Sequence, residues 1–375
     1  MKVVVSFDSF KGSLTASRAC RIAADALRKE WPGCRVVTVP MADGGEGTAE
    51  ALLSSGLGVW RPRRVMGPLP DMEVDAGTAW FPAERSALVE MASASGITHL
   101  RADQLNPMAT TTYGTGQLIR AVLDDKPGVI RLAVGGSATT DGGVGAAMAL
   151  GWRFLDAGGR DVGLGGAALE RIAEILPPFR GWSLPPVEVL CDVDNPLCGP
   201  DGAAAVYGPQ KGATPEMVVR LDQGLARLAE RVKQRFGTDM AGIRGAGAAG
   251  GLAGGAVAFL GASLVPGIRT ILCSSGLERE IKDADWVITG EGSFDSQSFR
   301  GKVVSGVLEA ALHTGAKVAV LAGRITVPEE RWRQAGVSAA LALAVPGMPT
   351  EEAMGRAEEL LRERVRELAA RIRKA

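Results

Sequence analysis

The sequence has few histidines and no excess of charge of either sign, and these shortages exclude several classes of protein. It contains only 2 histidines, and 42 lysines and arginines balance 42 aspartates and glutamates. A balanced charge provides neither a basic surface for nucleic acid nor an acidic tail for a charged partner. His99 and His313 lie outside the acidic, glycine-rich loops, so we expect no histidine-based triad or zinc site. A general base should therefore be a carboxylate.

The cysteines and the apolar segments exclude further classes. The 5 cysteines form no CxxC pair, which predicts a reduced, cytoplasmic protein without a disulfide framework. The first apolar run is too short for a secretory signal, and we expect it to form a strand. Residues 245–268 carry no charge and are long enough to span a bilayer, but they consist mainly of glycine and alanine. We therefore expect a buried loop and helix there.

The usual motifs for nucleotides and for hydrolases are also missing. The sequence has no GxxxxGK[ST] loop, no GxGxxG after the first strand, no HRD and DFG set and no GxSxG elbow. The glycines of GAGAAGG, which starts at Gly245, resemble the dinucleotide spacing but follow no clear strand. These absences argue against a Walker-type ATPase, a protein kinase and an α/β-hydrolase.

Both ends of the chain alternate between apolar runs and helical patterns. The runs that predict buried strands are residues 3–7, 34–39, 286–290, 317–323 and 338–345. Strands that alternate with helices predict a parallel sheet with right-handed crossovers. The last helix should begin after Thr350, which is a good N-cap residue.

The middle of the chain is richer in glycine, proline and irregular connections. One helix is clear there, because Thr214 and Pro215 form a typical helix start and Gly237 follows its end. We therefore predict an α/β protein of two domains. A Rossmann-like parallel-sheet domain would consist of residues 1–66 and 267–375, with a second α/β domain of residues 67–266 inserted between them.

Acidic, glycine-rich loops follow the predicted strands. Loops at the carboxyl ends of parallel strands share one edge of a sheet, and ligands bind at that edge. Each loop alone is explained by turns and helix caps, and Lys211 in GPQKGAT is expected to be an exposed lysine. Taken together, the loops offer carboxylates for Mg²⁺, backbone N–H groups for phosphate and lysines for the transferred charge. The combination indicates a site for a Mg-nucleotide.

Several stretches of the sequence, in this order, resemble the bacterial glycerate kinase family of glyoxylate and glucarate degradation. They are DSFKGSLTA, VPMADGGEGT, NPMATTTYGTG, GGSATTDGG, CDVDNPLCGPDGAAAVYGPQKGAT, GAGAAGGLAGG and DWVITGEGSFDSQ. The resemblance extends from residue 3 to at least residue 323. It implies ATP-dependent phosphorylation of D-glycerate with Mg²⁺, usually at the 2-hydroxyl. It also implies a two-domain, glycerate kinase-like α/β fold with the active site in the cleft between the domains.

The same motifs imply roles for individual residues. Asp192, Lys11 and Asp8 are the catalytic candidates, and Asp192 is the expected base or orienting group for the glycerate hydroxyl. Glu291 and Asp295, together with Asp8, are the candidates for Mg²⁺. The residues expected to bind substrate or nucleotide are Asp43, Gly44, Gly45, Glu46, Thr111, Thr112, Gly114, Gly135, Gly136, Ser137, Thr139, Asp141, Asn195 and Lys302.

The chain departs from the family pattern at a few positions. Thr140 stands where the family usually has Asn, and Arg300 stands where His is common. Ser293 and Phe294 stand where a basic residue and then an aliphatic one are common, and Arg324 stands where Ser is usual. The loss of a basic residue at 293 and its gain nearby leave two effects open: a shifted phosphate contact or an altered substrate preference.

The basic side chains also have candidate roles, and more than one product is compatible with the sequence. Lys11 and Lys302 would stabilise the phosphoryl charge, and Arg63, Arg64 and Arg324 are candidates for the glycerate carboxylate.

The favoured product is 2-phosphoglycerate. Two alternatives stay open: 3-phosphoglycerate as the product, and a related hydroxy acid such as tartronate or erythronate as the substrate. A non-catalytic sensor of a sugar acid or nucleotide would explain the glycine loops but not the carboxylates. The expected partners are ATP and D-glycerate, without nucleic acid or membrane, and a homodimer is left open.

Overall fold

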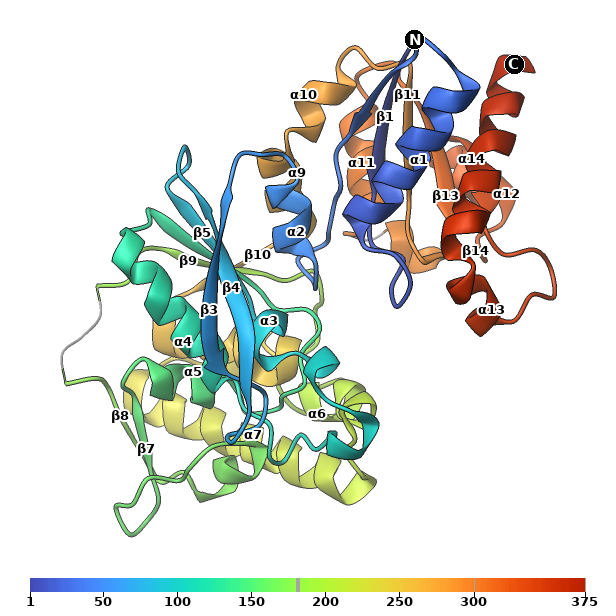
Figure 1. Ribbon diagram of the computed structural model, residues 1–375. Coiled ribbons are helices and arrows are strands. Elements are labelled where there is room, and N and C mark those ends of the chain that lie inside the picture. Colours follow the sequence, from blue (N-terminus) through green and yellow to red (C-terminus); the bar gives the residue numbers. More distant parts are fainter. Residues whose placement is uncertain (180–182, 300, 375) are drawn as a thin grey trace. The chain divides into compact units, whose positions relative to one another are not determined.

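A computed structural model describes residues 1–179, 183–299 and 301–374, and the chain divides into two compact units (Figure 1). Unit 1 consists of Met1–Asp43, Glu50–Leu57 and Pro266–Ala375, and unit 2 of Gly44–Ala49 and Gly58–Val265. Both ends of the chain therefore belong to one unit, and the middle of the chain forms the other.

Unit 1 is built on a five-stranded sheet in which every neighbouring pair is parallel. In order across the sheet, the strands are β15 (Val337–Ala342), β13 (Lys317–Ala322), β11 (Trp286–Gly290), β1 (Lys2–Phe7) and β2 (Arg35–Thr38). Each of them overlaps one of the predicted apolar runs, so the parallel sheet made from both chain ends is confirmed.

Helices cover both faces of this sheet, and unit 1 also contains a separate pair of short strands. The helices are α1 (Ala16–Glu30), α9 (Gly267–Ser275), α10 (Leu277–Ile281), α11 (Val303–Ala311), α12 (Glu329–Gln334), α13 (Thr350–Gly355) and α14 (Ala357–Lys374). A separate parallel pair is formed by β12 (Ser293–Phe294) and β14 (Arg324–Ile325). One of the boundaries between the units falls within α2 (Thr48–Leu53).

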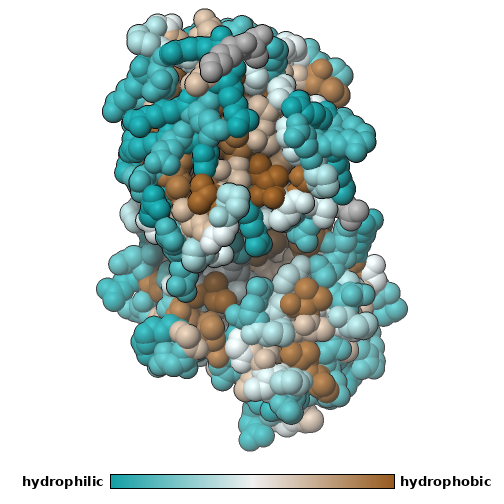
Figure 2. All heavy atoms as spheres, turned by 90° about the vertical axis from the view of Figure 1, so that its right-hand side faces the viewer, coloured by the Kyte–Doolittle hydropathy of each residue, from teal (hydrophilic) through white to brown (hydrophobic). Residues whose placement is uncertain are grey.

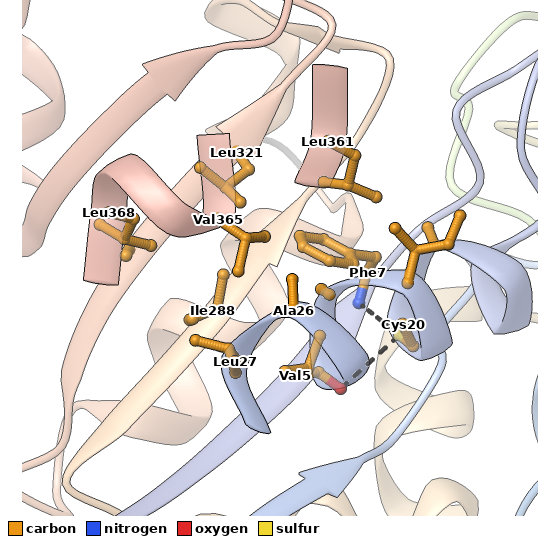
Figure 3. Packing of buried hydrophobic residues seen from close by; sticks show 14 of the residues in the cluster. Val5, Phe7, Cys20, Ala26, Leu27, Ile288, Leu321, Leu361, Val365 and Leu368 are labelled. Atoms are coloured by element: carbon orange, nitrogen blue, oxygen red, sulfur yellow. Dashed lines mark hydrogen bonds between the residues drawn. The ribbon is translucent and has the colours of Figure 1, made fainter. Parts of the chain in front are cut away.

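Alternate residues of the central strands face α1 and α14. Val5 and Phe7 of β1 pack there with Leu27 of α1 and Val365 of α14, and all of these side chains are 0% exposed (Figure 3). The Cys20 thiol joins α1 to β1, because its sulfur accepts a hydrogen bond from Phe7 N–H and donates one to the Val5 carbonyl. Strands buried on both faces read as continuous apolar runs, which is why the sequence revealed them.

Unit 2 contains a six-stranded mixed sheet. In order, its strands are β10 (Ser263–Val265), β9 (Val187–Leu190), β6 (Val129–Ala133), β5 (Ser86–Glu90), β4 (Glu73–Phe81) and β3 (Val59–Met66). The first four run parallel to one another, and β4 runs antiparallel to both of its neighbours, β5 and β3. Its other elements are α3 (Ala92–Ser95), α4 (Tyr113–Val122), α5 (Val144–Ala149), α6 (Ala203–Tyr207), α7 (Pro215–Phe236), α8 (Leu252–Leu260), β7 (Arg153–Leu155) and β8 (Glu174–Leu176).

The position of β3 places the boundary between the units before this strand. β3 pairs with β4 along its whole length, from Val59 opposite Trp80 to Met66 opposite Glu73. It therefore belongs to unit 2, whereas the sequence boundary after residue 66 assigned it to the first domain. β3 is an edge strand whose residues are mostly exposed and include three arginines, so it lacks the apolar run that marks a buried strand.

The predicted helix ends agree with the structure in one case and disagree in another. Thr214 caps α7 by accepting a hydrogen bond from Met217 N–H, and Gly237 ends the helix with a φ of 75°. Thr350, in contrast, is not an N-cap residue, because Pro349 occupies that position. The expected single helix after Thr350 is also two helices, α13 and α14, with a break at Arg356 after Gly355. Glycine favours such a break because it stabilises a helix poorly.

The glycine-rich segment 245–268 is packed inside unit 2. It contains α8, most of whose residues are buried, and the short strand β10. Within residues 1–179, 183–299 and 301–374, no helix has the length and apolar character needed to cross a membrane. On the face drawn in Figure 2, hydrophilic residues predominate and the hydrophobic ones form small separate groups.

Leu27→Ala should test the packing of unit 1. We expect the free energy of unfolding of this unit to fall by about 2–5 kcal/mol, because the truncation leaves a cavity between α1, α14 and the sheet. Chemical denaturation measures this loss. Leu312→Ala is the matched control, since Leu312 is 73% exposed and its truncation should change the stability by less than about 0.5 kcal/mol. Equal effects of the two substitutions would contradict the described core.

Candidate active site

The first group of candidate residues lies in unit 1, at the carboxyl ends of its central strands. β1 and β11 are parallel with Phe7 opposite Gly290, so Asp8 and Glu291, which follow them, emerge at the same edge of the sheet. Asp8 N–H also donates a hydrogen bond to the Gly290 carbonyl at 2.9 Å. The sequence prediction that these strand-end carboxylates converge therefore agrees with their placement within this unit.

Negative charge is concentrated in this group. Burial raises the pKa of Asp8 well above its ordinary value, and the nearby carboxylates of Asp43 and Glu291 raise it further. Burial also raises the pKa of Glu291, whose side chain is 7% exposed. Lys302 opposes these effects, with its Nζ 3.7 Å from Glu291 Oε2. The group therefore favours an additional cation.

One carboxylate oxygen of this group has no internal partner. Glu291 Oε1 is buried, and no hydrogen bond to it is found among the described residues. A buried acceptor without a partner is unfavourable, so this oxygen is suited to a ligand from outside the chain. Within the same described part, no three side chains of His, Cys, Asp or Glu form a set that could hold a metal ion. A cation bound here would therefore take further oxygen ligands from water or phosphate.

Lys11 and Asp295 lie in the loops next to this group. A Cβ atom placed on Gly292 would lie 3.5 Å from the Lys11 backbone nitrogen, so the two loops are adjacent. Lys11 itself is exposed. Asp295 is partly engaged already, because its Oδ1 accepts a hydrogen bond from Gln297 N–H at 2.8 Å and its Oδ2 accepts one from the Ser293 hydroxyl at 3.3 Å.

The departures from the family pattern at 293 and 324 are structurally coupled. Ser293 of β12 stands directly opposite Arg324 of β14, and Arg324 Nε donates a hydrogen bond to Ser293 Oγ at 3.1 Å. The basic side chain at position 324 thus reaches across the strand pair to position 293, where the resemblance predicted a basic residue. Phe294, beside them, is fully buried. Arg300, the other departure in this region, lies outside the described residues.

The second group lies in unit 2 and is centred on Asp141. This side chain is 1% exposed, and its oxygens accept hydrogen bonds from Thr112 N–H at 2.8 Å, Gly145 N–H at 3.2 Å and Gly143 N–H at 3.1 Å. The hydroxyls of Thr111 and Thr112 donate to it as well. Burial raises the pKa of Asp141, and the hydrogen bonds from Thr112, Gly143 and Gly145 lower it.

The structure brings together Asp141, Thr111 and Thr112, which were expected to bind substrate or nucleotide, and it buries all three. Both threonines are 0% exposed. Their side chains hold the loop before α5 to the start of α4. Gly114 also serves packing, because a Cβ atom there would lie 1.9 Å from the Met66 carbonyl oxygen. Thr140, the unusual residue of this loop, is 0% exposed as well.

The accessible part of this loop is residues 135–137. Gly135 and Gly136 are half-buried, and Ser137 is 9% exposed, whereas Thr139 is 0% exposed. The expected loop around Gly44 lies against it: Gly135 N–H donates to the Gly44 carbonyl at 3.5 Å, and a Cβ atom on Gly135 would lie 2.4 Å from Gly45 Cα. Only glycine at position 135 permits this approach of the two backbones.

Glu46 and a residue that the sequence analysis missed, Glu90, complete this region of unit 2. The Glu46 side chain lies beside Gly136. Glu90 ends β5 and is 9% exposed, and its Oε1 accepts a hydrogen bond from Ala49 N–H at 3.2 Å. Burial raises the pKa of Glu90 to about 7, and hydrogen bonds from the backbone of residues 47–49 lower it. Its place at a strand end was a usable signal, but β5 itself was not predicted.

The remaining candidates from the CDVDNPL motif follow β9. Asp192 is half-buried one residue beyond Cys191, whose backbone N–H bonds to Val265 of the neighbouring strand. Asn195 has an internal role, because its amide donates to the Asp201 carbonyl at 2.9 Å and accepts from the Tyr207 hydroxyl at 2.6 Å. Asp194, by contrast, is exposed and pairs with Arg244 at 2.6 Å.

Two of the arginines considered for a substrate carboxylate lie on a strand and not in these loops. Arg63 and Arg64 belong to β3, the edge strand of the unit 2 sheet, and both are exposed. Arg64 pairs with Glu73 of β4 at 3.0 Å. Lys211, expected to be exposed, is instead 2% exposed and bonds to the loop of Ser137. Sequence reasoning missed this lysine because it does not show which oxygen atoms surround a side chain.

Comparison with known proteins gives a consistent result over the whole chain. The model of the glycerate kinase family matches residues 3–373. The glycerate kinase of Halalkalibacterium halodurans is 41% identical over 372 residues, which cover 98% of this chain and 97% of that protein. The glycerate 2-kinase of Escherichia coli is 39% identical over 376 residues, which cover 99% and 98%. A solved structure from Salmonella typhimurium LT2, assigned as glycerate kinase 2, superposes with a TM-score of 0.84 at 40% identity and covers 100% of this chain and 98% of that one.

Glu90→Gln should reveal the cost of burying this carboxylate. The pKa of Glu90 is raised from 4.5 to about 7, so the folded chain binds more protons than the unfolded chain between these values. The contribution of Glu90 to the free energy of unfolding is therefore fully present below pH 4.5, where the carboxyl is protonated in both states, and it is lost as the pH rises through 7. We expect the stability of the variant, relative to the parent protein, to rise over this window by up to ~3 kcal/mol.

Chemical denaturation at pH 5 and at pH 7.5 measures this difference. Glu309→Gln is the matched control, because Glu309 lies on the exposed side of α11 and its substitution should have the same effect at both pH values. A difference that is constant with pH, or that falls as the pH rises, would show that Glu90 is not a buried carboxylate.

Proposed function

Since the chain belongs to the glycerate kinase family, we propose that it transfers the γ-phosphoryl group of ATP to the 2-hydroxyl of D-glycerate with Mg²⁺. The observation that carries this proposal is the match to the family over residues 3–373. The name of the Escherichia coli relative, a glycerate 2-kinase at 39% identity, favours 2-phosphoglycerate as the product. The expected position of the active site between the two domains stays a prediction.

Glu291 and Asp295 are proposed to hold Mg²⁺ together with the phosphates and water. The residues present fit this ion, because Mg²⁺ is usually bound by one or two carboxylates and keeps several waters or phosphate oxygens. The unpartnered Oε1 of Glu291 is one such ligand. When bound, Mg²⁺ neutralises charge on the phosphates. It would also lower the pKa of Asp8 and Glu291, whose ionised forms are destabilised by burial.

Lysine side chains around this group are proposed to stabilise the phosphoryl oxygens. Lys302 already faces Glu291, and Lys11 lies in the loop beside Gly292. Phosphoryl transfer depends mainly on positioning and on charge stabilisation, so two ammonium groups beside a cation suit it. Arg324 adds a basic group next to Asp295 through Ser293.

Asp192 is proposed to orient the glycerate hydroxyl and to accept its proton. In this step the hydroxyl oxygen bonds to the γ-phosphorus, and the bond from that phosphorus to the bridging oxygen breaks to release ADP. The hydroxyl proton passes to the Asp192 carboxylate. A carboxylate suits this task because the two histidines of the chain lie outside the candidate loops. The loop of residues 135–137 is proposed to bind an anionic group of ATP or glycerate.

Phosphorus NMR of a reaction with ATP and D-glycerate tests the proposal directly. We expect ADP and 2-phosphoglycerate to accumulate in equal amounts when Mg²⁺ is present. Formation of 3-phosphoglycerate would refute the proposed position of transfer and retain the kinase. A higher catalytic efficiency with tartronate or erythronate would refute D-glycerate as the preferred substrate. Tight binding of either substrate without turnover would favour a sensor.

Asp192→Asn should lower kcat by about 10²–10⁴-fold, the usual contribution of a positioned general base. The matched control is Asp194→Asn, two residues further along the same loop, since Asp194 is 68% exposed and pairs with Arg244. The control should keep near-normal turnover. Steady-state kinetics on both variants, with thermal unfolding to verify folding, measure the difference. Near-normal kcat in a folded Asp192→Asn variant would remove this role from Asp192.

A further inference from the structure

A lysine is buried beneath the accessible part of the glycine-rich loop of unit 2. Lys211 is 2% exposed, and its Nζ donates hydrogen bonds to Ser137 Oγ at 2.7 Å and to the Thr139 carbonyl at 2.6 Å. Lysine is almost never fully buried unless it is paired. The next residue, Gly212, packs against Leu105, because a Cβ atom there would lie 2.4 Å from the Leu105 carbonyl oxygen.

The charge of this lysine is supported by a nearby carboxylate as well as by these two hydrogen bonds. Burial lowers the pKa of Lys211 to about 7, and the carboxylate of Asp141 raises it. Asp141 is itself occupied by the donors of Thr112, Gly143 and Gly145. A second negative charge close to Ser137 would therefore stabilise the ammonium form further. In the interior such an interaction is stronger than in water, because the local dielectric constant is low.

The hydrogen bond to Ser137 also fixes what this serine can offer to a ligand. Ser137 Oγ accepts from the ammonium group, so its own proton points elsewhere. Among the hydroxyls of this loop, those of Thr139 and Thr140 are 0% exposed, whereas Ser137 is 9% exposed and follows two half-buried glycines. A hydroxyl that accepts from a cation is polarised and becomes a stronger donor.

We propose that Lys211 is a positioning residue that presents the Ser137 hydroxyl as a donor to an anionic oxygen of a substrate. The oxygen belongs to a nucleotide phosphate or to the carboxylate of the hydroxy acid, which share this chemistry. The inference rests on the proposed function and adds a residue that the sequence alone predicted to be an exposed lysine. It gives the loop of residues 135–137 a positive charge even though no cationic side chain occurs within it.

Calorimetric titrations without turnover test the proposal with two probes, ADP and D-glycerate, each added alone. Ser137→Ala removes the donor, and Lys211→Met removes the group that orients it. We expect both substitutions to weaken the binding of the same probe by about tenfold or more, the effect of losing a charge-assisted hydrogen bond. The probe that is affected identifies the anion, and the binding of the other should be unchanged.

The double variant distinguishes positioning from independent contacts. If Lys211 acts through Ser137, the double variant should bind the probe with the same affinity as the single variant that has the lower affinity. Ser86→Ala is the matched control. Ser86 is also a buried serine with one side-chain hydrogen bond, and it lies at the start of β5, whereas the candidate loops follow the ends of the strands. The control should bind both probes normally. Effects that multiply in the double variant would overturn the proposal.

Folding defects do not remove the test. Should Lys211→Met fail to fold, Lys211→Gln retains a donor at the same position without the charge, and Ser137→Ala remains decisive by itself. A folded Ser137→Ala protein that binds both probes as tightly as the parent overturns the proposal. Binding that depends on Ser137 and Lys211 in a protein that makes no phosphoglycerate would instead refute the proposed function and leave this assignment standing.

Discussion

The arrangement of two loops of unit 2 depends on the burial of one carboxylate. Asp141 is inaccessible to solvent and receives hydrogen bonds from Thr112, Gly143 and Gly145, which come from the starts of two different helices. Its charge also supports the ammonium group of Lys211. Removal of this carboxylate would leave several donors without their acceptor and would take away the negative charge that supports a buried cation, so the accessible loop above it depends on a buried residue.

The carboxylates of unit 1 differ from Asp141 in what surrounds them. Asp8 and Glu291 lie close to each other and to Asp43, and Lys302 is the positive side chain that opposes their charge. Glu291 also retains a buried oxygen without a hydrogen-bond partner among the described residues. The same residue type therefore has two uses in this chain. A carboxylate whose acceptors are filled holds the backbone, and one whose acceptors are not filled is available for chemistry.

The sequence predicts those features that follow from continuous apolar runs. Three strands of unit 1, β1, β11 and β13, were found because they are buried on both faces, and the partly buried β2 and β15 were found because they also read as apolar runs. β3 was missed because an exposed edge strand has no such run, and with it the boundary between the units. Site loops could be located from strand ends and glycine, but not the direction of each side chain. Hence Asp141 was expected to face a ligand, and Lys211 to face solvent.

The hydrogen bond between Ser293 and Arg324 has a consequence for substitutions at either position. The two residues face each other across β12 and β14, so the effect of a change at one depends on the residue at the other. A basic residue at position 293 would face the Arg324 guanidinium and be repelled by it, whereas a serine at position 324 would leave the pair without a charge. Either change alters the charge beside Asp295, which Ser293 contacts. The two positions therefore act as one unit, and the residue at either position is informative only together with the residue at the other.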